Sequence, residues 1–175
     1  RHVFFVSSTS VYGQETQEWL DEDTLPLPRD FSGQRMLEAE ALLADYPATV
    51  LRFSGIYGPG RARMVTLAQT PAQWPSKNGW TNRIHRDDGA AFIQYLIGQL
   101  GHVIPARLYL VTDSQPVALY AVLHWLAQRL QVEAGAIMPP PVAGNKRLSN
   151  QRMLATGYRF IYPDYTAGYQ ALLNA

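Results

Sequence analysis

The sequence predicts an α/β fold in which parallel strands alternate with helices. Residues 3–6 are apolar without alternation, the pattern of a strand that is covered on both faces of a parallel sheet. Residues 49–53 form a second strand-like run, and the intervening stretch 33–46 carries apolar residues at helical spacing. This order of strand, helix and strand predicts a right-handed parallel crossover.

Composition limits the classes of function that are open to the chain. Its 175 residues are 47% apolar and 17% charged, which suits one domain or one incomplete domain. The net charge is only +1 and the arginines are scattered, so we expect no nucleic-acid partner. The absence of cysteine excludes disulfides and thiolate chemistry. No run of about 18 apolar residues occurs, so no membrane-spanning helix is predicted.

The remaining elements follow from caps, breakers and periodicity. Residues 14–32 are acidic and contain proline, so they are expected to form a loop. Residues 57–82 form a second long loop with a short helix near 62–69, and a loop of this length is more often functional than idle. Four helices and one strand complete the prediction: a helix capped by Asp87 or Asp88 and running to about 100, a strand at 107–111, and helices at 117–130, 149–155 and 163–173.

Four segments, read in order, carry a family resemblance. They are 5–13 (FVSSTSVYG), 51–60 (LRFSGIYGPG), 84–88 (IHRDD) and 109–113 (YLVTD). Together they resemble the extended and atypical short-chain dehydrogenase/reductases, the NAD-dependent epimerase/dehydratase family. The resemblance implies the C-terminal part of a Rossmann-type doubly wound parallel sheet plus a smaller, helical and loop-rich substrate-side region.

The resemblance also implies how the chain is divided. Residues 1–60 correspond to the C-terminal part of the dinucleotide-binding domain, and residues 61–175 to the substrate-side region with interleaved strands and helices. No glycine-rich phosphate turn follows a strand. The chain opens directly on a strand without an initiator methionine, so we expect it to be cut from a longer protein.

The family's catalytic pair is a tyrosine acid/base and a lysine four residues later on the same helix face. Here the tyrosine position is Phe31 and the lysine position is Arg35, while the family's strand-end serine falls on Ser8. Phenylalanine has no proton to transfer and arginine stays protonated. The standard chemistry is therefore not expected, although Ser8 could retain a substrate contact or simply bond the turn backbone. Tyr12 or Tyr57 could substitute for the missing acid.

The resemblance implies further binding residues. Thr81 stands where many nucleotide-sugar enzymes of the family have a diphosphate-binding arginine, which puts a nucleotide-sugar substrate in doubt. His85 has no metal-ligand partner at suitable spacing and is interpreted as a structural hydrogen-bonder, and Trp74 as a loop anchor or a pocket wall. The predicted cofactor-binding residues are Ser7, Arg35, Ser54, Gly55, Ile56 and Tyr57, and the predicted substrate-side residues are Tyr12, Arg61, Arg63, Trp80 and Arg83. The three arginines could instead be solvated surface residues, and Trp80, like Trp74, could be a loop anchor.

Two functional hypotheses remain open from the sequence. The first is a fragment of an NAD(P)-dependent epimerase/dehydratase-like oxidoreductase with a degenerate catalytic motif. The second is a non-catalytic module that binds a dinucleotide or metabolite, and an interaction role is a weaker third. We expect NAD or NADP to bind the full-length parent and not this chain alone, no metal, a small-molecule substrate, a homodimer, and a cytoplasmic location.

Overall fold

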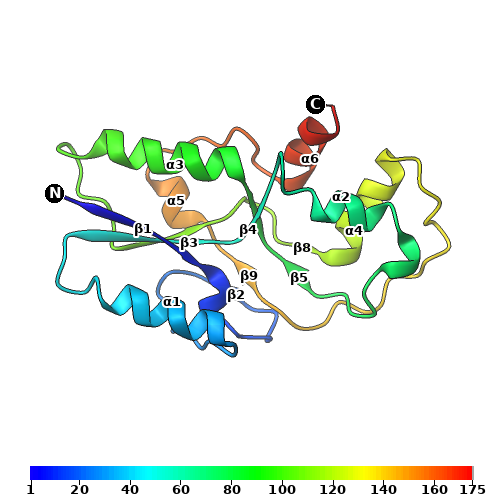
Figure 1. The fold of residues 1–175 in the computed structure, drawn as a ribbon, viewed down its shortest axis with the longest axis horizontal. Helices are drawn as coiled ribbons and strands as arrows, with labels where there is room; N and C mark the ends of the chain where they lie inside the picture. Colours follow the sequence, from blue (N-terminus) through cyan, green and yellow to red (C-terminus); the bar gives the residue numbers. More distant parts are fainter. Residues whose placement is uncertain (175) are drawn as a thin grey trace.

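A three-stranded parallel sheet organises one end of the molecule (Figure 1). The computed structural model describes residues 1–174. The strands β1 (Val3–Ser8), β3 (Ala48–Phe53) and β7 (Leu108–Val111) lie in the order β1-β3-β7. All pairs are parallel, with Val3 opposite Ala48 and Val50 opposite Leu108. The α/β fold class with a parallel sheet is thereby confirmed.

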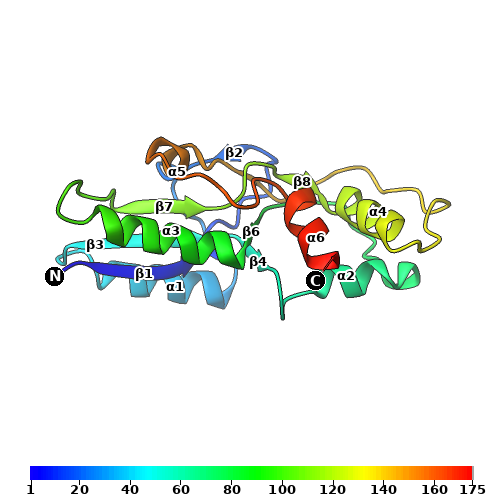
Figure 2. The same cartoon turned by 90° about the horizontal axis from the view of Figure 1, so that it is seen from above.

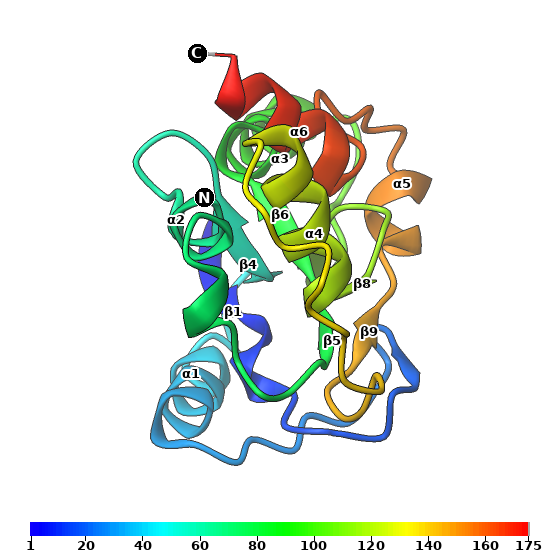
Figure 3. The same ribbon diagram turned by 90° about the vertical axis from the view of Figure 1, so that its right-hand side faces the viewer.

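Helices cover both faces of this sheet. Figures 1 and 3 show α1 (Phe31–Ala41) and α3 (Arg86–Gln99) on opposite sides of the strands. Alternation along β3 explains this arrangement, because successive side chains point to opposite faces. Leu51 and Phe53 join the buried cluster that includes Phe92 of α3, whereas Arg52 points to α1 and binds Glu40.

Three helices form the other end of the molecule, seen beyond the sheet in Figure 2. They are α2 (Arg63–Ala68), α4 (Leu119–Arg129) and α6 (Tyr165–Leu173). Their core is a second apolar cluster that includes Tyr57, Leu123 and Tyr169. The short helix α5 (Gln151–Ala155) packs instead against β7. Residues beyond 60 therefore contribute to both ends of the molecule.

Short strand pairs connect the two ends. β4 (Gly55–Tyr57) pairs with β6 (Arg83–His85), β2 (Trp19–Leu20) with β9 (Arg147–Leu148), and β5 (Trp80–Thr81) with β8 (Val117–Ala118). Two 3₁₀ turns, η1 (Thr9–Val11) and η2 (Pro71–Gln73), complete the fold. No helix among residues 1–174 is long and apolar enough to cross a membrane.

Two helix starts differ from the sequence prediction. Helix α1 begins at Phe31 because the Asp30 carboxylate accepts the Gly33 N–H at 2.6 Å as N-cap. The predicted cap of α3 was wrong: His85 is the N-cap, and its Nδ1 accepts the Asp87 N–H at 3.2 Å. Asp88 is buried and accepts hydrogen bonds from the Tyr158 hydroxyl and from two backbone N–H groups of residues 161 and 162 instead.

Candidate functional site

The carboxyl ends of the parallel strands meet at one edge, where ligands bind in open α/β sheets. Ser8, the last residue of β1, lies opposite Phe53 at the end of β3. Its Oγ accepts the Ser10 N–H at 3.1 Å and caps η1. The neighbouring Ser54 hydroxyl donates to the Val111 carbonyl at 3.3 Å. The hydroxyls of Ser8 and Ser54 thus both interact with the backbone.

Phe31 and Arg35 stand together on the exposed side of α1. The Phe31 side chain is 71% exposed, and the Arg35 guanidinium carbon lies 4.9 Å from its ring centroid. Arg35 also binds Glu38 at 2.5 Å in an exposed ion pair. The pair keeps the i, i+4 geometry of a helical face. Neither side chain can transfer a proton, because one has none to give and the other stays charged.

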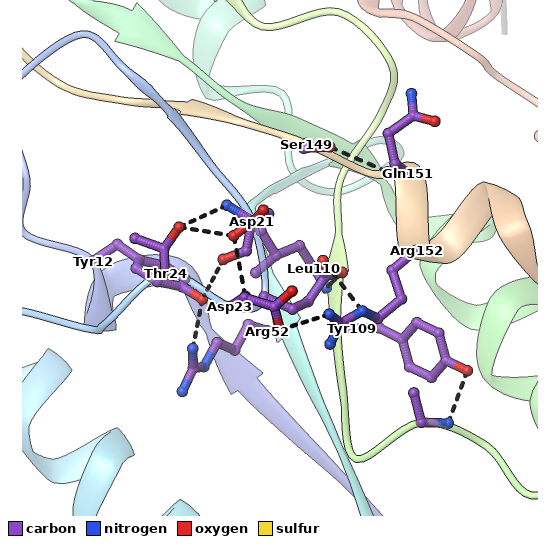
Figure 4. Close-up of polar contacts among 12 residues, drawn as sticks. Tyr12, Asp21, Asp23, Thr24, Arg52, Tyr109, Leu110, Ser149, Gln151 and Arg152 are labelled. Carbon is purple, nitrogen blue, oxygen red and sulfur yellow. Dashed lines mark hydrogen bonds and ion pairs between the residues drawn. The ribbon is translucent and has the colours of Figure 1, made fainter.

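Tyr12 is poorly placed to act as an acid, because its side chain is fully buried and its hydroxyl is already hydrogen-bonded. Figure 4 shows these contacts: the hydroxyl accepts from Arg52 Nη1 at 2.6 Å and donates to the Asp21 carbonyl at 3.2 Å. Arg52 in turn binds Glu40 with two nitrogens, at 3.0 and 2.6 Å, and Glu40 accepts from the Ser7 hydroxyl. Burial raises the pKa of Tyr12. This network holds β1, β3 and α1 together.

Tyr57 is equally removed from solvent. Its ring packs on Tyr169, with centroids 4.4 Å apart, and meets His85 edge-on at 5.2 Å. Burial raises the pKa of Tyr57 far above its ordinary value, and the Asp113 carboxylate adds to the effect. The structure thus presents Tyr57 as a packing residue of the second core.

A buried polar cluster lies behind Tyr57. Arg83 Nη1, Asp113 Oδ2 and the Tyr57 hydroxyl have no hydrogen-bond partner among the described residues. Burial raises the pKa of Asp113 to about 7, although the Arg83 charge opposes this shift. Asp113 Oδ1 accepts the Gln115 N–H at 3.1 Å. A cluster with three unsatisfied buried atoms is energetically costly.

A cavity of about 810 Å³ opens beside the end of β1. Its walls come from residues 10, 12–15, 29–30, 75–81, 140–141 and 143–146, with Leu119. Asn78 and Asn82 hold two of these walls together, because their Nδ2 groups donate to the Pro140 and Lys146 carbonyls at 2.8 and 2.9 Å. The volume is in the range of small-molecule sites.

The structure brings some predicted substrate residues to this cavity and leaves others outside it. Trp80 lines it, and Tyr12 lies in its wall with its side chain fully buried. Arg61 and Arg63 are exposed and do not contribute to its walls. Arg83 is only 4% exposed and donates to the Thr81 hydroxyl at 2.6 Å, so its charge lies behind the wall. Trp74 packs in the second core and donates to the Leu67 carbonyl.

The predicted cofactor residues fit only part of a dinucleotide. Ser7, Ser54 and Tyr57 are buried and turned into the protein. Gly55 is exposed and Ile56 half-exposed just beyond the end of β3, so these two could contact the nicotinamide end of a cofactor. The exposed Arg35 could bond a ribose hydroxyl. No group of three or more metal-ligating side chains gathers among residues 1–174.

Sequence reasoning did not identify Lys146, Gln14 and Asp30, all of which line the cavity. Lys146 lies 134 residues from Tyr12, whose carbonyl accepts a hydrogen bond from its Nζ. The rarity of lysine was the one available signal, because the chain has only Lys77 and Lys146 and both line the cavity.

Solved structures provide a direct comparison. A provisionally assigned NAD-dependent epimerase/dehydratase from Methylobacillus flagellatus is 67% identical, with a TM-score of 0.97 over 99% of this chain and 63% of that chain. A functionally unknown conserved protein from Silicibacter pomeroyi is 28% identical, with a TM-score of 0.78 over 99% of this chain and 66% of that one. A human epimerase family protein with NADPH is 17% identical, with a TM-score of 0.80 over 99% and 65%.

Other comparisons define the limits of this match. Further matched structures at 16–18% identity were solved with NAD and show the shared fold alone. No protein-family model and no curated protein matches the chain. The chain spans less than two thirds of the two most similar structures described above. The fold and the 67% identical relative agree with the family that the four motifs resemble, the NAD-dependent epimerase/dehydratase family.

Proposed function

We propose that this chain supplies the substrate-side cavity and part of the cofactor edge of an NAD(P)-dependent epimerase/dehydratase-like protein. The cavity beside β1 carries the proposal, because it is built from Ser10 and Tyr12, which directly follow the strand end that carries Ser8. A small molecule bound there would lie next to the edge at which open α/β sheets bind their ligands.

The cofactor proposal concerns the longer protein. Matched structures contain NAD or NADPH, and Gly55 and Ile56 are accessible at the end of β3. The cofactor, when bound, would supply hydride exchange. This chain offers no glycine-rich turn for the pyrophosphate, so we propose that NAD or NADP binds the longer protein and not this chain by itself.

The catalytic step is where this protein departs from its family. Phe31 and Arg35 supply no proton at the family's acid/base position, and the hydroxyls of Tyr12 and Tyr57 are buried. These observations favour a second candidate function, a module that binds dinucleotide and metabolite without turnover. The retained Ser8 strand end and accessible Gly55 support the first candidate, an oxidoreductase with an altered acid/base set.

Calorimetry with NAD(H) and NADP(H) tests the cofactor proposal. We expect micromolar binding by the longer protein and none by this chain. Binding by neither would refute the cofactor proposal and leave a dehydrogenase-like scaffold used for another purpose.

Restoring the catalytic pair separates the two candidate functions. The double variant Phe31→Tyr, Arg35→Lys places both groups back at i, i+4 on an exposed helix face. If the native protein is a binding module, substrate-dependent oxidation of bound NAD(P)H should appear only in the double variant. Equal turnover by the native protein would instead show that another group handles the proton.

We further propose a homodimer that involves α1. The side chains of Leu42 and Tyr46, just beyond this helix, are exposed. Burying such apolar side chains in a partner would stabilise the assembly. Sedimentation of the longer protein tests this proposal, which a monomer at micromolar concentration would contradict.

A further inference from the structure

The cavity beside β1 carries a small net positive charge. Its cationic side chains are Arg29, Lys77 and Lys146, and its acidic side chains are Glu15 and Asp30. Arg29 and Glu15 form an ion pair at 3.0 Å, and Asp30 accepts the Gly33 N–H as the cap of α1. Three cations against two carboxylates leave one net positive charge at neutral pH, so the lining suits a single negative charge.

Lys146 is the lining cation that is best placed to meet that charge. Its ammonium donates to the Tyr12 carbonyl, its one hydrogen-bond partner among residues 1–174. An ammonium has three donors, so two remain available. Lys146 is only partly exposed, and burial lowers its pKa while the Asp30 and Glu15 charges oppose that shift. A partly buried cation without an ion-pair partner gains free energy when an anion binds it.

Two unsatisfied oxygens lie in the same walls. Ser10 Oγ and Gln14 Oε1 are buried and have no partner in the structure. The Gln14 amide is fixed through its Nε2, which donates to the Leu25 carbonyl at 2.8 Å. Its Oε1 therefore lacks a donor, and the Ser10 hydroxyl, which can donate or accept, lacks a partner. Both atoms are closed off from solvent, so a ligand hydroxyl reaches them only when these side chains turn toward the cavity. Buried polar atoms of this kind are uncommon unless a ligand or water pairs with them.

The structure also argues against a diphosphate in this cavity. Thr81 stands in place of an arginine, and its hydroxyl is used as an acceptor by the buried Arg83. Arg61 and Arg63 lie outside the walls. A diphosphate would bring more than one negative charge close to Glu15 and Asp30, and like charges in one site repel.

We propose that this cavity binds a hydroxylated carboxylic acid of monosaccharide size, whose carboxylate is held by Lys146 and whose hydroxyls face the polar wall to which Ser10 and Gln14 belong. The proposal rests on the proposed function of the cavity as the substrate site. The proposed ligand is a free, singly charged molecule and not a nucleotide-linked sugar.

Calorimetry with three matched probes tests the ligand class. Glucuronate carries the carboxylate, glucose lacks it, and UDP-glucose adds a diphosphate. We expect glucuronate to bind the protein at least 10-fold more tightly than glucose, and UDP-glucose to gain nothing over glucose. The gain follows from a charge-assisted hydrogen bond in a partly desolvated site.

Two variants separate Lys146 from general charge effects. Lys146→Gln should weaken glucuronate binding roughly 10- to 100-fold and leave glucose binding unchanged. Lys77→Gln removes the same charge from an exposed residue of the same cavity, and screening should limit its effect to about twofold. Thermal unfolding of each variant confirms that both are folded.

The other outcomes would overturn the proposal. Tighter binding of UDP-glucose than of glucuronate would assign the cavity to nucleotide sugars, and equal losses in the two lysine variants would remove the special role of Lys146. No binding of glucuronate would also refute the ligand class. NAD(P)H binding by the longer protein is measured separately, so the proposed function can stand while this inference fails.

Discussion

Asp113 offers a stability test that follows directly from the buried polar cluster. Its carboxylate is 1% exposed, and burial raises its pKa from an ordinary value of 3.8 to about 7. The substitution Asp113→Asn removes the charge while retaining an Oδ1 that can accept the Gln115 N–H. It therefore changes the electrostatics of the site with little change in shape.

The sign of the effect follows from proton linkage. The pKa of Asp113 is higher in the folded protein than in the unfolded chain, so as pH rises the unfolded chain loses its proton first. The native protein is therefore expected to lose stability between about pH 4 and pH 7, and to lose no more above pH 7. A shift of about three pKa units corresponds to at most about 4 kcal/mol. Asp113→Asn should not show this loss of stability with rising pH.

Urea unfolding of this chain between pH 5 and pH 8.5 measures the difference. The free-energy advantage of Asp113→Asn over the native chain should increase with pH, and its thermal midpoint at pH 8 should rise by roughly 5–15 °C. A pH-independent cost of placing an amide near Arg83 would change the variant's free energy of unfolding equally at every pH. It would leave the pH dependence of the difference between variant and native chain unchanged. Asp45→Asn, at an exposed carboxylate, is the matched control. A pH-independent difference for Asp113→Asn would refute the reasoning.

Two further predictions concern packing and buried charge. Arg52→Met should lower the free energy of unfolding by about 3–5 kcal/mol, because Glu40 is then left as a largely buried, unpaired carboxylate. Denaturant unfolding measures this loss, and a change under about 1 kcal/mol would contradict the prediction. Gly168→Ala should destabilise by about 1–3 kcal/mol or more, since a Cβ there would lie 1.9 Å from the Tyr57 hydroxyl oxygen. Gly98→Ala, in α3 with nothing within 4 Å, is its control and should stabilise by about 0.5–1 kcal/mol.

The regular elements were largely predictable because their signals are local. The periodicity of α3 reflects burial against the sheet. The unbroken apolar run correctly predicted strand β1, but not its cover on both faces: β1 is an edge strand here, and Val3 and Val6 are exposed. The cap of α3 was not predictable in the same way. Asp87 and Asp88 both looked suitable, but the Asp88 carboxylate accepts hydrogen bonds from Tyr158 and from backbone N–H groups 70 or more residues away. His85 is the N-cap instead.

The cavity could not be predicted from local patterns. Its walls at 75–81 and 140–146 are irregular and are joined by the amide side chains of Asn78 and Asn82. Nothing in the sequence pairs either asparagine with its carbonyl partner more than 60 residues away. The family resemblance located Tyr12, and the aromatic character of the long loop located Trp80, but Lys146 lies in neither.

Phe31 and Arg35, which stand where the family resemblance places a tyrosine and a lysine, bear on chemistry more than on structure. Both positions are exposed, so neither side chain is needed to fill the core. The Arg35 guanidinium stacks on the Phe31 ring, and this contact is worth only about 0.5–1 kcal/mol at an exposed site. Phe31 therefore exposes a large apolar surface that the fold of this chain does not use. Since the residue lies at the start of α1, beside the edge formed by Ser8 and Ser10, its side chain is better explained by what occupies that edge in the longer protein than by stability. A flat, apolar, non-ionising side chain suits contact with a ring of a bound cofactor or ligand, as the proposed binding function requires.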